Sequence, residues 1–382
     1  MVFAHTPPWA VGVSVAKKAP GSHRPPNMRS EKRGVTGQGN RFGRQPRNTP
    51  MGIVLRLTAA LLLVGVLAAS IVRQPQSPAG KLRIVAGPVP AFPGANGRRG
   101  PALEYVSAGA AAVDGPRWIL VYHRASGNAD AFAWEPHLAI SEDGGRVWQD
   151  YGRINLGSTA TEGVYVTSLL RHEDAWWAFY NRFDQEAKLY YIEVARSDDL
   201  IHWSGQWRPT LFPGVTNACV VKDDDAWYMF TSEWLYRKLG FRLRLFKAQE
   251  LTGVYRDCGV VVSPGTQAPA WCRDALWDSE VFKLGGRWYI WFGGAQKPGE
   301  NLTAHGYAVA DRITGPYTVA PEPLLRWSSV VGGRAAHFPL SPQAVRIFTD
   351  VFYPRKLGEP SGIELVSLDL AISAPGPAEP AP

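Results

Sequence analysis

The residues of this sequence that are best suited to chemistry are carboxylates. Glu104, Glu162 and Asp278 stand in three separate segments of the chain, and Asp274 and Glu280 flank the third of them. Two carboxyl groups can share acid–base work when one keeps its proton, through burial or a like-charged neighbour, while the other stays ionised. Acid–base catalysis is therefore the first candidate chemistry, provided that the fold brings these segments together.

Other reaction chemistry finds little support in the sequence. The eight histidines are scattered without the spacing of metal ligands, and there is no glycine-rich phosphate loop and no serine nucleophile elbow. We therefore predict no organic cofactor and disfavour a metal enzyme. A lone structural cation beside His337 remains open as an alternative.

Aromatic strands recur along the chain and would have to position the carboxylates. Segments rich in strand formers begin near Trp118, Trp176, Trp227 and Trp288, at steps of 58, 51 and 61 residues, and Val345 continues the series after 57. Each segment is followed by a second strand and a turn, as in SEDGGRVW (141–148) and ARSDDLIHW (195–203). The Ser and Asp side chains of these turns are expected to bind backbone amides of a hairpin corner rather than to act in catalysis.

Five such units predict the fold. A unit of about fifty residues cannot bury both faces of its sheet alone, so neighbouring units must pack together, and radial closure leaves few free strand edges. We therefore predict an all-β fold, a five-bladed β-propeller over residues 81–371, with the strand at Lys81 completing the last blade. Most aromatics recur at one place in each unit and are assigned to interblade packing, whereas Trp134, Trp234 and Trp277 lie off the repeat and could face a ligand.

The chain before the propeller has a different composition. Residues 1–50 hold nine Lys or Arg and one acidic residue, which accounts for the whole net charge of +8. They are predicted to be a disordered basic tail or a non-native extension, and the neutral remainder gives no reason to expect a nucleic-acid partner. Residues 51–73 read as a signal peptide or, through the apolar stretch 53–72, a membrane anchor, and 74–80 as a linker. The protein is thus expected to be secreted or extracytoplasmic, free or anchored, with a disordered Pro/Ala-rich tail over 372–382.

Cysteine usage excludes a disulfide scaffold, because the chain has only three cysteines. Cys258 and Cys272 flank a loop rich in Pro and Gly, so they could pair in an oxidising compartment or remain free. Cys219 stands in an apolar run and is expected to be a buried thiol.

Three segments, taken in register, resemble the blades of a known group of enzymes. They are DSEVFKLGGRWYIWFGG (278–294), ADRITGPY (310–317) and ARSDDLIHW. Their order resembles that in five-bladed glycosidase propellers, the group of family-43 arabinanases and β-xylosidases and, more distantly, the invertases and levansucrases of families 32 and 68. The resemblance covers residues 81–371 and implies a hydrolase that cleaves glycosidic bonds of a poly- or oligosaccharide. Together with the signal-like segment, this leads us to expect an exported enzyme, and we expect it to be a monomer. SEDGGRVW also fits the Asp-box turn of sialidases, but one copy does not indicate a sialidase.

The resemblance also implies where a site would lie, since these enzymes place carboxylates from different blades near the start of each innermost strand. We call the five equivalent residues, Trp118, Trp176, Trp227, Trp288 and Val345, the repeat residues. The residues ten positions before them are Ala108, Val166, Asn217, Asp278 and Ala335. The aspartates of the first two blades and the glutamate of the third are therefore missing. The residues four positions earlier are Glu104, Glu162, Pro213, Asp274 and Val331. Glu104, Glu162 and Asp278 are accordingly expected to converge from three blades.

Roles for these residues follow if the resemblance extends to function. Glycosidic cleavage needs an acid that protonates the leaving oxygen and a carboxylate opposite it. Glu104 or Glu162 would be the base and Asp278 or Glu280 the acid. The residues expected to contact substrate are Asp274, Trp277, Arg334, His337 and Asn217. The alternative is a non-catalytic propeller that binds carbohydrate or a protein at the cell surface, which the missing aspartates favour.

Overall fold

The computed structural model describes the chain from residue 81 onward in ten stretches: 81–91, 104–126, 134–156, 164–184, 189–209, 214–235, 241–296, 302–330, 334–353 and 362–373. The predicted basic tail (1–50), signal or anchor segment (51–73) and linker (74–80) lie outside these stretches, as do residues 374–382 of the predicted C-terminal tail. Among the residues that are described, no helix is long and apolar enough to cross a membrane.

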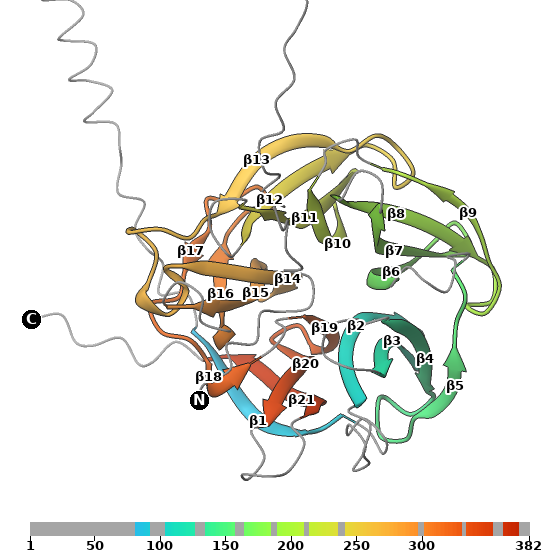
Figure 1. Ribbon diagram of the computed structural model, residues 1–382, viewed down its shortest axis with the longest axis horizontal. Coiled ribbons are helices and arrows are strands. Elements are labelled where there is room, and N and C mark those ends of the chain that lie inside the picture. The colour runs from blue at the N-terminus through green and yellow to red at the C-terminus, as the bar shows by residue number, and fades with distance from the viewer. Residues whose placement is uncertain are drawn as a thin grey trace, which may run out of the picture. The chain divides into compact units, whose positions relative to one another are not determined.

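The described chain is a five-bladed β-propeller, as predicted (Figure 1). Each of the first four blades runs in sequence from its innermost to its outermost strands. Blade 1 holds β2 (Glu104–Asp114), β3 (Arg117–Ser126), β4 (Glu135–Ser141) and β5 (Gln149–Arg153). Blade 2 holds β6 (Tyr165–His172), β7 (Ala175–Asp184), β8 (Leu189–Ser197) and β9 (Trp203–Trp207).

The remaining blades vary this plan at their outer edges. Blade 3 holds β10 (Val215–Asp223), β11 (Ala226–Trp234), β12 (Phe241–Ala248) and β13 (Arg256–Val262). Blade 4 holds β14 (Ala275–Leu284), β15 (Arg287–Ala295), β16 (Leu302–Ala310), β17 (Thr318–Val319) and β18 (Leu325–Val330), and a short 3-10 helix, η2 (Ala270–Cys272), precedes it. Blade 5 holds β19 (Ala335–Ser341), β20 (Ala344–Tyr353), β21 (Gly362–Ile372) and β1 (Leu82–Pro90).

The ring closes through its first and last described strands. β1 pairs antiparallel with β21, from Leu82 opposite Ile372 to Pro90 opposite Val366, which confirms that the strand at Lys81 completes the last blade. β21 also reaches one residue into the predicted tail. Both ends of the propeller are therefore held in one blade.

The hairpin corners are the turns that the sequence predicts. In ARSDDLIHW, the Leu200 amide donates to Ser197 Oγ (2.9 Å), and the His202 amide donates to Asp199 Oδ1 (2.8 Å). Ser141 and Asp143 repeat this arrangement in SEDGGRVW, where Ser141 Oγ accepts from the Gly145 amide at 2.8 Å. These side chains stabilise corners on the outer part of the blades.

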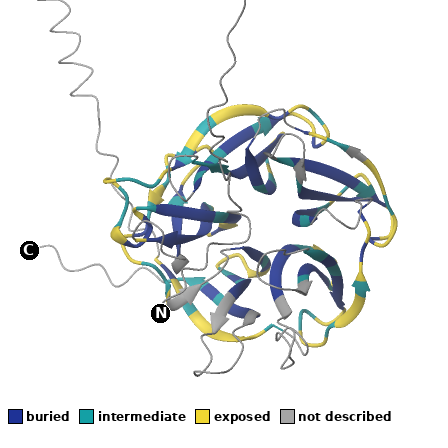
Figure 2. Ribbon diagram, in the orientation of Figure 1, coloured by how far each residue is buried: buried dark blue, intermediate teal, exposed yellow. Residues whose placement is uncertain are grey.

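The hydrophobic core is divided into clusters, each of which lies between neighbouring blades. The buried residues lie mainly on the inner strands, and the exposed ones mainly along the outer edges of the blades (Figure 2). Trp176 packs with strands of blade 1, Trp227 with those of blade 2 and Trp288 with those of blade 3. Trp118 stacks on Phe338 of blade 5 with ring centroids 4.4 Å apart. The repeated aromatics are therefore interblade packing residues, as predicted.

A repeated hydrogen bond also joins neighbouring blades close to the axis. The acceptor is the side chain five positions after the repeat residue of one blade. The donor is the backbone amide ten positions before the repeat residue of the next blade. The described residues form three such bonds: Val166 N to His123 Nε2 (2.8 Å), Asn217 N to Asn181 Oδ1 (2.8 Å) and Ala108 N to Asp350 Oδ1 (2.6 Å). We call His123, Asn181, Ser232, Gly293 and Asp350 the interblade positions. Ser232 is buried, and its hydroxyl finds no hydrogen-bond partner among the described residues.

The cysteines are free thiols, so the bridge considered between Cys258 and Cys272 is not formed. Cys258 is exposed on the outer strand β13, whereas Cys272 is buried in the cluster between blades 3 and 4. Cys219 is buried, as expected, and accepts a hydrogen bond from the Val281 amide.

Closure by β1 predicts a position-dependent loss of stability. Leu82 is 2% exposed and packs in the cluster between blades 4 and 5, whereas Val85 on the same strand is 50% exposed. We expect Leu82→Ala to lower the free energy of unfolding by about 2–5 kcal/mol. Val85→Ala should change it by less than about 0.5 kcal/mol. Urea denaturation of both variants checks this, and equal effects would contradict the docking of β1.

Two of the interblade positions, Asn181 and Ser232, provide a second pair of variants whose stabilities can be compared. Asn181→Ala leaves the Asn217 amide buried without its acceptor, so we expect the free energy of unfolding to fall by about 1–3 kcal/mol. Ser232→Ala removes a buried hydroxyl that makes no hydrogen bond to a described residue, and it should cost much less or stabilise the protein. Denaturant unfolding of the two variants measures the difference, and a larger loss for Ser232→Ala would refute the assignment.

Candidate functional site

The candidate site lies where the innermost strands β2, β6, β10, β14 and β19 begin. On β10 and β14 the pairing register is interrupted by bulges between Thr216 and Cys219 and between Trp277 and Ser279. The bulges contain Asn217 and Asp278, which have positive φ angles of 57° and 44°. Asn and Asp tolerate this conformation better than most residues, and a bulge re-aims the side chain that it carries.

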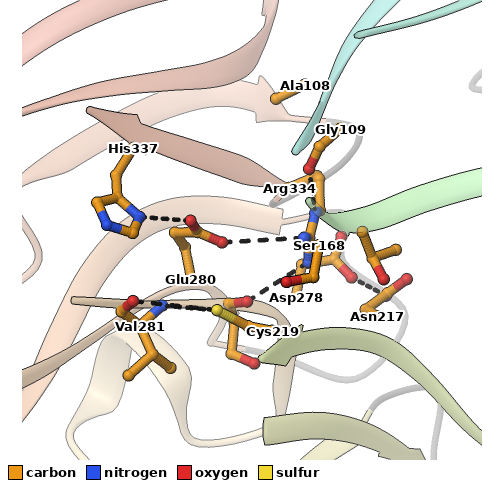
Figure 3. A network of polar contacts seen from close by, with 12 residues as sticks. Ala108, Gly109, Ser168, Asn217, Cys219, Asp278, Glu280, Val281, Arg334 and His337 are labelled. Atoms are coloured by element: carbon orange, nitrogen blue, oxygen red, sulfur yellow. Dashed lines mark hydrogen bonds and ion pairs between the residues drawn. The ribbon is translucent and has the colours of Figure 1, made fainter. Parts of the chain in front are cut away.

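The two bulged side chains meet. Asn217 Nδ2 donates to Asp278 Oδ1 (Figure 3). Asn217 Oδ1 accepts from Asn181 Nδ2. Because Asn181 fixes the orientation of the Asn217 amide, that amide presents its donor to the half-buried Asp278 carboxylate. Side chains from blades 2, 3 and 4 thus hold one carboxylate in place.

A second group is centred on the buried Arg334, which is 1% exposed. Its Nε donates to Gly109 O (3.0 Å) and its Nη1 to Ser279 O (3.4 Å). Its Nη2 lies 3.8 Å from Glu280 Oε2, and Glu280 Oε1 lies 2.6 Å from His337 Nδ1 (Figure 3). Both oxygens of Glu280 therefore face nitrogen atoms of neighbouring side chains, so the buried carboxyl group is not left without polar partners.

A third group contains a carboxyl that sequence reasoning missed. Asp350, on β20, is 2% exposed and lies 2.6 Å from Ser107 Oγ through Oδ2. Burial raises the pKa of Asp350 to about 8, against the lowering effect of its bonds from Ser107 and the Ala108 amide, and the negative charge of Asp278 raises it further. Asp350 therefore carries a proton at neutral pH.

Tyr165 connects this carboxyl to the start of β6. Its hydroxyl bonds to Ser107 Oγ and donates to Ala108 O at 2.7 Å. Burial, and secondly the charge of Asp350, raise the pKa of Tyr165 well above its usual range, so its phenol keeps its proton.

His123 stacks on the Tyr165 ring with centroids 3.9 Å apart. Burial lowers the pKa of His123 well below its usual range, and Arg334 lowers it further, so the imidazole is neutral and accepts from the Val166 amide through Nε2. Trp134 meets both rings edge-on. This aromatic group fills the boundary between blades 1 and 2.

The predicted site residues are only partly assembled. Asn217 meets Asp278, and Glu280 meets Arg334 and His337. Glu104 begins β2, but its side chain lies outside the described part of the chain, and Glu162 lies outside the described residues altogether. The convergence of these two glutamates with Asp278 remains a prediction.

Two further predicted contacts lie next to Asp278. Asp274 is half-buried and immediately precedes β14, where its amide donates to Ala295 O (3.1 Å). Trp277 is buried in a small cluster with Phe241 and the half-buried Trp234. These aromatics form a wall between blades 3 and 4.

The missed residues carried a usable signal. Asp350 and His123 stand five positions after their repeat residues, and the same count gives Asn181 and Ser232, so four of the five interblade positions are polar. Counting forward from the repeat residues, as well as backward, would have found them. Tyr165 and Ser107 have no comparable signal, because their importance depends on contacts with Asp350.

Metal ligands do not gather in this region. Within the stretches that the structure describes, no group of three or more His, Cys, Asp or Glu side chains could hold a metal ion. The His337 nitrogen that was considered beside a structural cation is instead bonded to Glu280.

Comparison with known proteins identifies the fold. No protein-family model and no curated protein matches the chain. Among solved structures, a thermostable family-43 glycoside hydrolase has a TM-score of 0.53 at 16% identity, covering 73% of this chain and 96% of its own. The GH43_1 enzyme from Xanthomonas citri complexed with xylose has a TM-score of 0.55 at 14% identity, covering 76% and 92%. The catalytic domain of the Coprinopsis cinerea GH62 alpha-L-arabinofuranosidase has a TM-score of 0.51 at 10% identity, covering 76% and 97%.

The chain has the fold of family-43 and family-62 glycoside hydrolases. The resemblance seen in the blade segments is confirmed at the level of architecture. Within this glycosidase fold, Ala108 and Val166 stand where the resemblance leads one to expect aspartates, and the described chain uses their backbone amides for interblade bonds. Among the described residues, the carboxyl groups of the site come from blades 4 and 5.

The raised pKa of Asp350 predicts a specific pH dependence of stability. The native state keeps a proton that the unfolded chain loses, so this group's contribution to the free energy of unfolding falls as pH rises from about 4 to about 8. The slope is at most about 1.4 kcal/mol per pH unit, and there is no further change outside that window. Asp350→Asn can donate to Ser107 and accept from Ala108 without charge, so it should remove this slope and be the more stable protein at pH 8.

Urea denaturation across this pH range measures the effect. The control is Asp369→Asn, which removes a carboxylate paired with Arg346 on the neighbouring strand and should leave the slope between pH 4 and 8 intact. Parallel pH curves for Asp350→Asn and the unmodified protein would show that Asp350 is ionised in the native state.

Proposed function

We propose that this chain is an exported glycoside hydrolase that binds a poly- or oligosaccharide where its innermost strands begin and cleaves a glycosidic bond there. The observation that carries the proposal is that Asn217 holds the Asp278 carboxylate at the start of blade 4, while a second carboxyl, that of Asp350, is buried against Ser107 and the Ala108 amide at the start of blade 1. Burial raises the pKa of Asp350 to about 8. Glycoside hydrolysis needs a protonated acid function and a second carboxylate in one site. Export is supported by the apolar segment predicted over residues 51–73.

Asp278 is assigned the role of the carboxylate that acts on the anomeric carbon or on water. Its position at a bulge of the innermost strand of blade 4 and its bond from Asn217 hold it in a fixed orientation. Glu280 suits the role of acid less well, because Arg334 and His337 face its two oxygens. We assign Glu280 and Arg334 to positioning rather than to proton transfer.

Aromatic side chains beside these groups support a carbohydrate ligand. Trp134 and Trp234 are half-buried, and they lie near the site from the boundaries between blades 1 and 2 and between blades 3 and 4. Sugar rings stack on such surfaces through their C–H faces. The solved relatives named above include one crystallised with xylose, which is consistent with a pentose or hexose chain as ligand.

A second candidate function is a non-catalytic carbohydrate-binding propeller. The observation that favours it is the replacement of the expected aspartates by Ala108 and Val166, whose amides serve the structure. This candidate retains the aromatic surfaces but makes Asp278 a ligand-binding group only.

Turnover assays on the full chain decide between these candidates. Aryl glycosides of pentoses and hexoses and plant and bacterial polysaccharides are screened first. Asp278→Asn should then lower kcat/KM by about 10²- to 10⁴-fold, because it removes the reacting carboxylate. Asp311→Asn, on an exposed turn after β16, is the matched control and should have no effect. Glu104→Gln and Glu162→Gln test the predicted bases in the same assay.

Three outcomes are informative. Sugar binding without turnover establishes the binding propeller. Turnover that survives Asp278→Asn keeps the glycosidase but rejects this assignment of the site. A chain that neither binds nor cleaves any of the sugars would reject both functions.

A further inference from the structure

A continuous chain of hydrogen bonds runs from the buried carboxyl of Asp350 to Tyr165. Asp350 Oδ2 lies 2.6 Å from Ser107 Oγ, and Ser107 Oγ in turn bonds to the Tyr165 hydroxyl. The chain crosses three blades, since Asp350 lies on β20, Ser107 on β2 and Tyr165 on β6. Asp350 and Ser107 are 2% and 1% exposed, whereas Tyr165 is partly exposed. Tyr165 is thus the one member of the chain whose side chain is not fully buried.

The charged and titratable groups around this chain keep a proton on Asp350. Burial is the main cause, and Asp278 on β14 adds a negative charge, while Arg334 on β19 opposes both. On the side of Tyr165, the neutral His123 on β3 takes no proton because its own pKa is lowered by burial. The stored proton therefore has one hydrogen-bonded route among the described residues, through Ser107 to Tyr165.

We propose that Asp350, Ser107 and Tyr165 form a proton-supply chain in which the Tyr165 hydroxyl protonates the leaving oxygen of the glycoside. The proposal rests on the proposed function and names the acid that this function requires. Asp350 is a positioning residue that stores the proton, and Tyr165 is the catalytic residue, because it alone of the three reaches the substrate.

The step balances without a co-reactant other than water. The bond between the anomeric carbon and the leaving oxygen breaks, and that oxygen takes the Tyr165 proton. Tyr165 takes a proton from Ser107, Ser107 takes one from Asp350, and Asp350 is left as a carboxylate. Water supplies hydroxide to the anomeric carbon and gives its remaining proton to Asp278. Asp278 then loses that proton to solvent, and Asp350 regains one from solvent by the reverse route, from Tyr165 through Ser107.

Leaving-group dependence tests the proposal. A dinitrophenyl glycoside departs without protonation, whereas an alkyl glycoside needs an acid. We expect Tyr165→Phe to lower kcat on alkyl glycosides by about 10²- to 10⁴-fold and to leave kcat on dinitrophenyl glycosides within about threefold of the unmodified protein. Asp350→Asn should act in the same direction and should abolish the alkaline limb of the pH profile near 8.

The matched control is Tyr180→Phe, which removes another buried phenol hydroxyl bonded to a carboxylate, that of Glu193 at 3.2 Å. It should show no leaving-group dependence. An equal loss on both substrates for Tyr165→Phe would overturn the proton-supply role, because that pattern is produced by misfolding or lost binding.

If no glycoside is cleaved, the proposed function is rejected. An NMR titration of Asp350 can still test the hydrogen-bonded chain in that case. With ¹³C-labelled aspartate, the Asp350 carboxyl should titrate near pH 8 in the unmodified protein. Ser107→Ala and Tyr165→Phe should move that titration, and Tyr180→Phe should not. Ionisation of Asp350 well below pH 7, or the same titration in all four proteins, overturns the chain.

Discussion

The structure depends on one repeated constraint, the meeting of neighbouring blades close to the axis. At that boundary the amide of each bulged inner strand would be buried without a strand partner, and a buried amide without a partner is costly. In three of the five boundaries a side chain from the preceding blade accepts its hydrogen. The aromatic clusters bring the blades together, and these polar contacts fix how the innermost strands sit against one another.

One of the interblade positions, Asp350, also carries a group that could act in the proposed chemistry. His123 and Asn181 can make the interblade bond as neutral side chains, whereas Asp350 makes it with a carboxyl group that burial keeps protonated. The hydrogen bond between the Ala108 amide and Asp350 joins blades 1 and 5. It thus holds a protonated carboxyl group close enough to Asp278 for the charge of Asp278 to affect its pKa. Among the described residues, a buried acidic group thus lies at a boundary between blades rather than at the blade positions expected by resemblance.

The fold could be predicted from the sequence because its signal is periodic. Trp118, Trp176, Trp227 and Trp288 mark the same strand in successive blades, and Ser197 with Asp199 marks a corner. The site was harder, since a bulge shifts the count along a strand by a residue or two, and periodicity cannot show which carboxyl is buried. The sequence named Asp278 and Asn217, which meet in the structure, and Glu280, Arg334 and His337, which also meet, because all five lie near the starts of inner strands. Whether they act in a site remains a prediction. Asp350 was missed because what sets it apart is its burial and its hydrogen bonds with Ser107 and Ala108, which lie 243 and 242 residues away in the chain.

Because the contact between Ala108 and Asp350 joins blade 1 to blade 5, it can form only after both blades have been synthesised. Asp350 follows Ala108 by 242 residues in the chain, so during synthesis the Ala108 amide is made before the side chain that accepts its hydrogen. A chain that lacks blade 5 also lacks the Asp350 carboxyl that accepts from the Ala108 amide. Under the proposed function, translation must therefore reach blade 5 before an active protein can form.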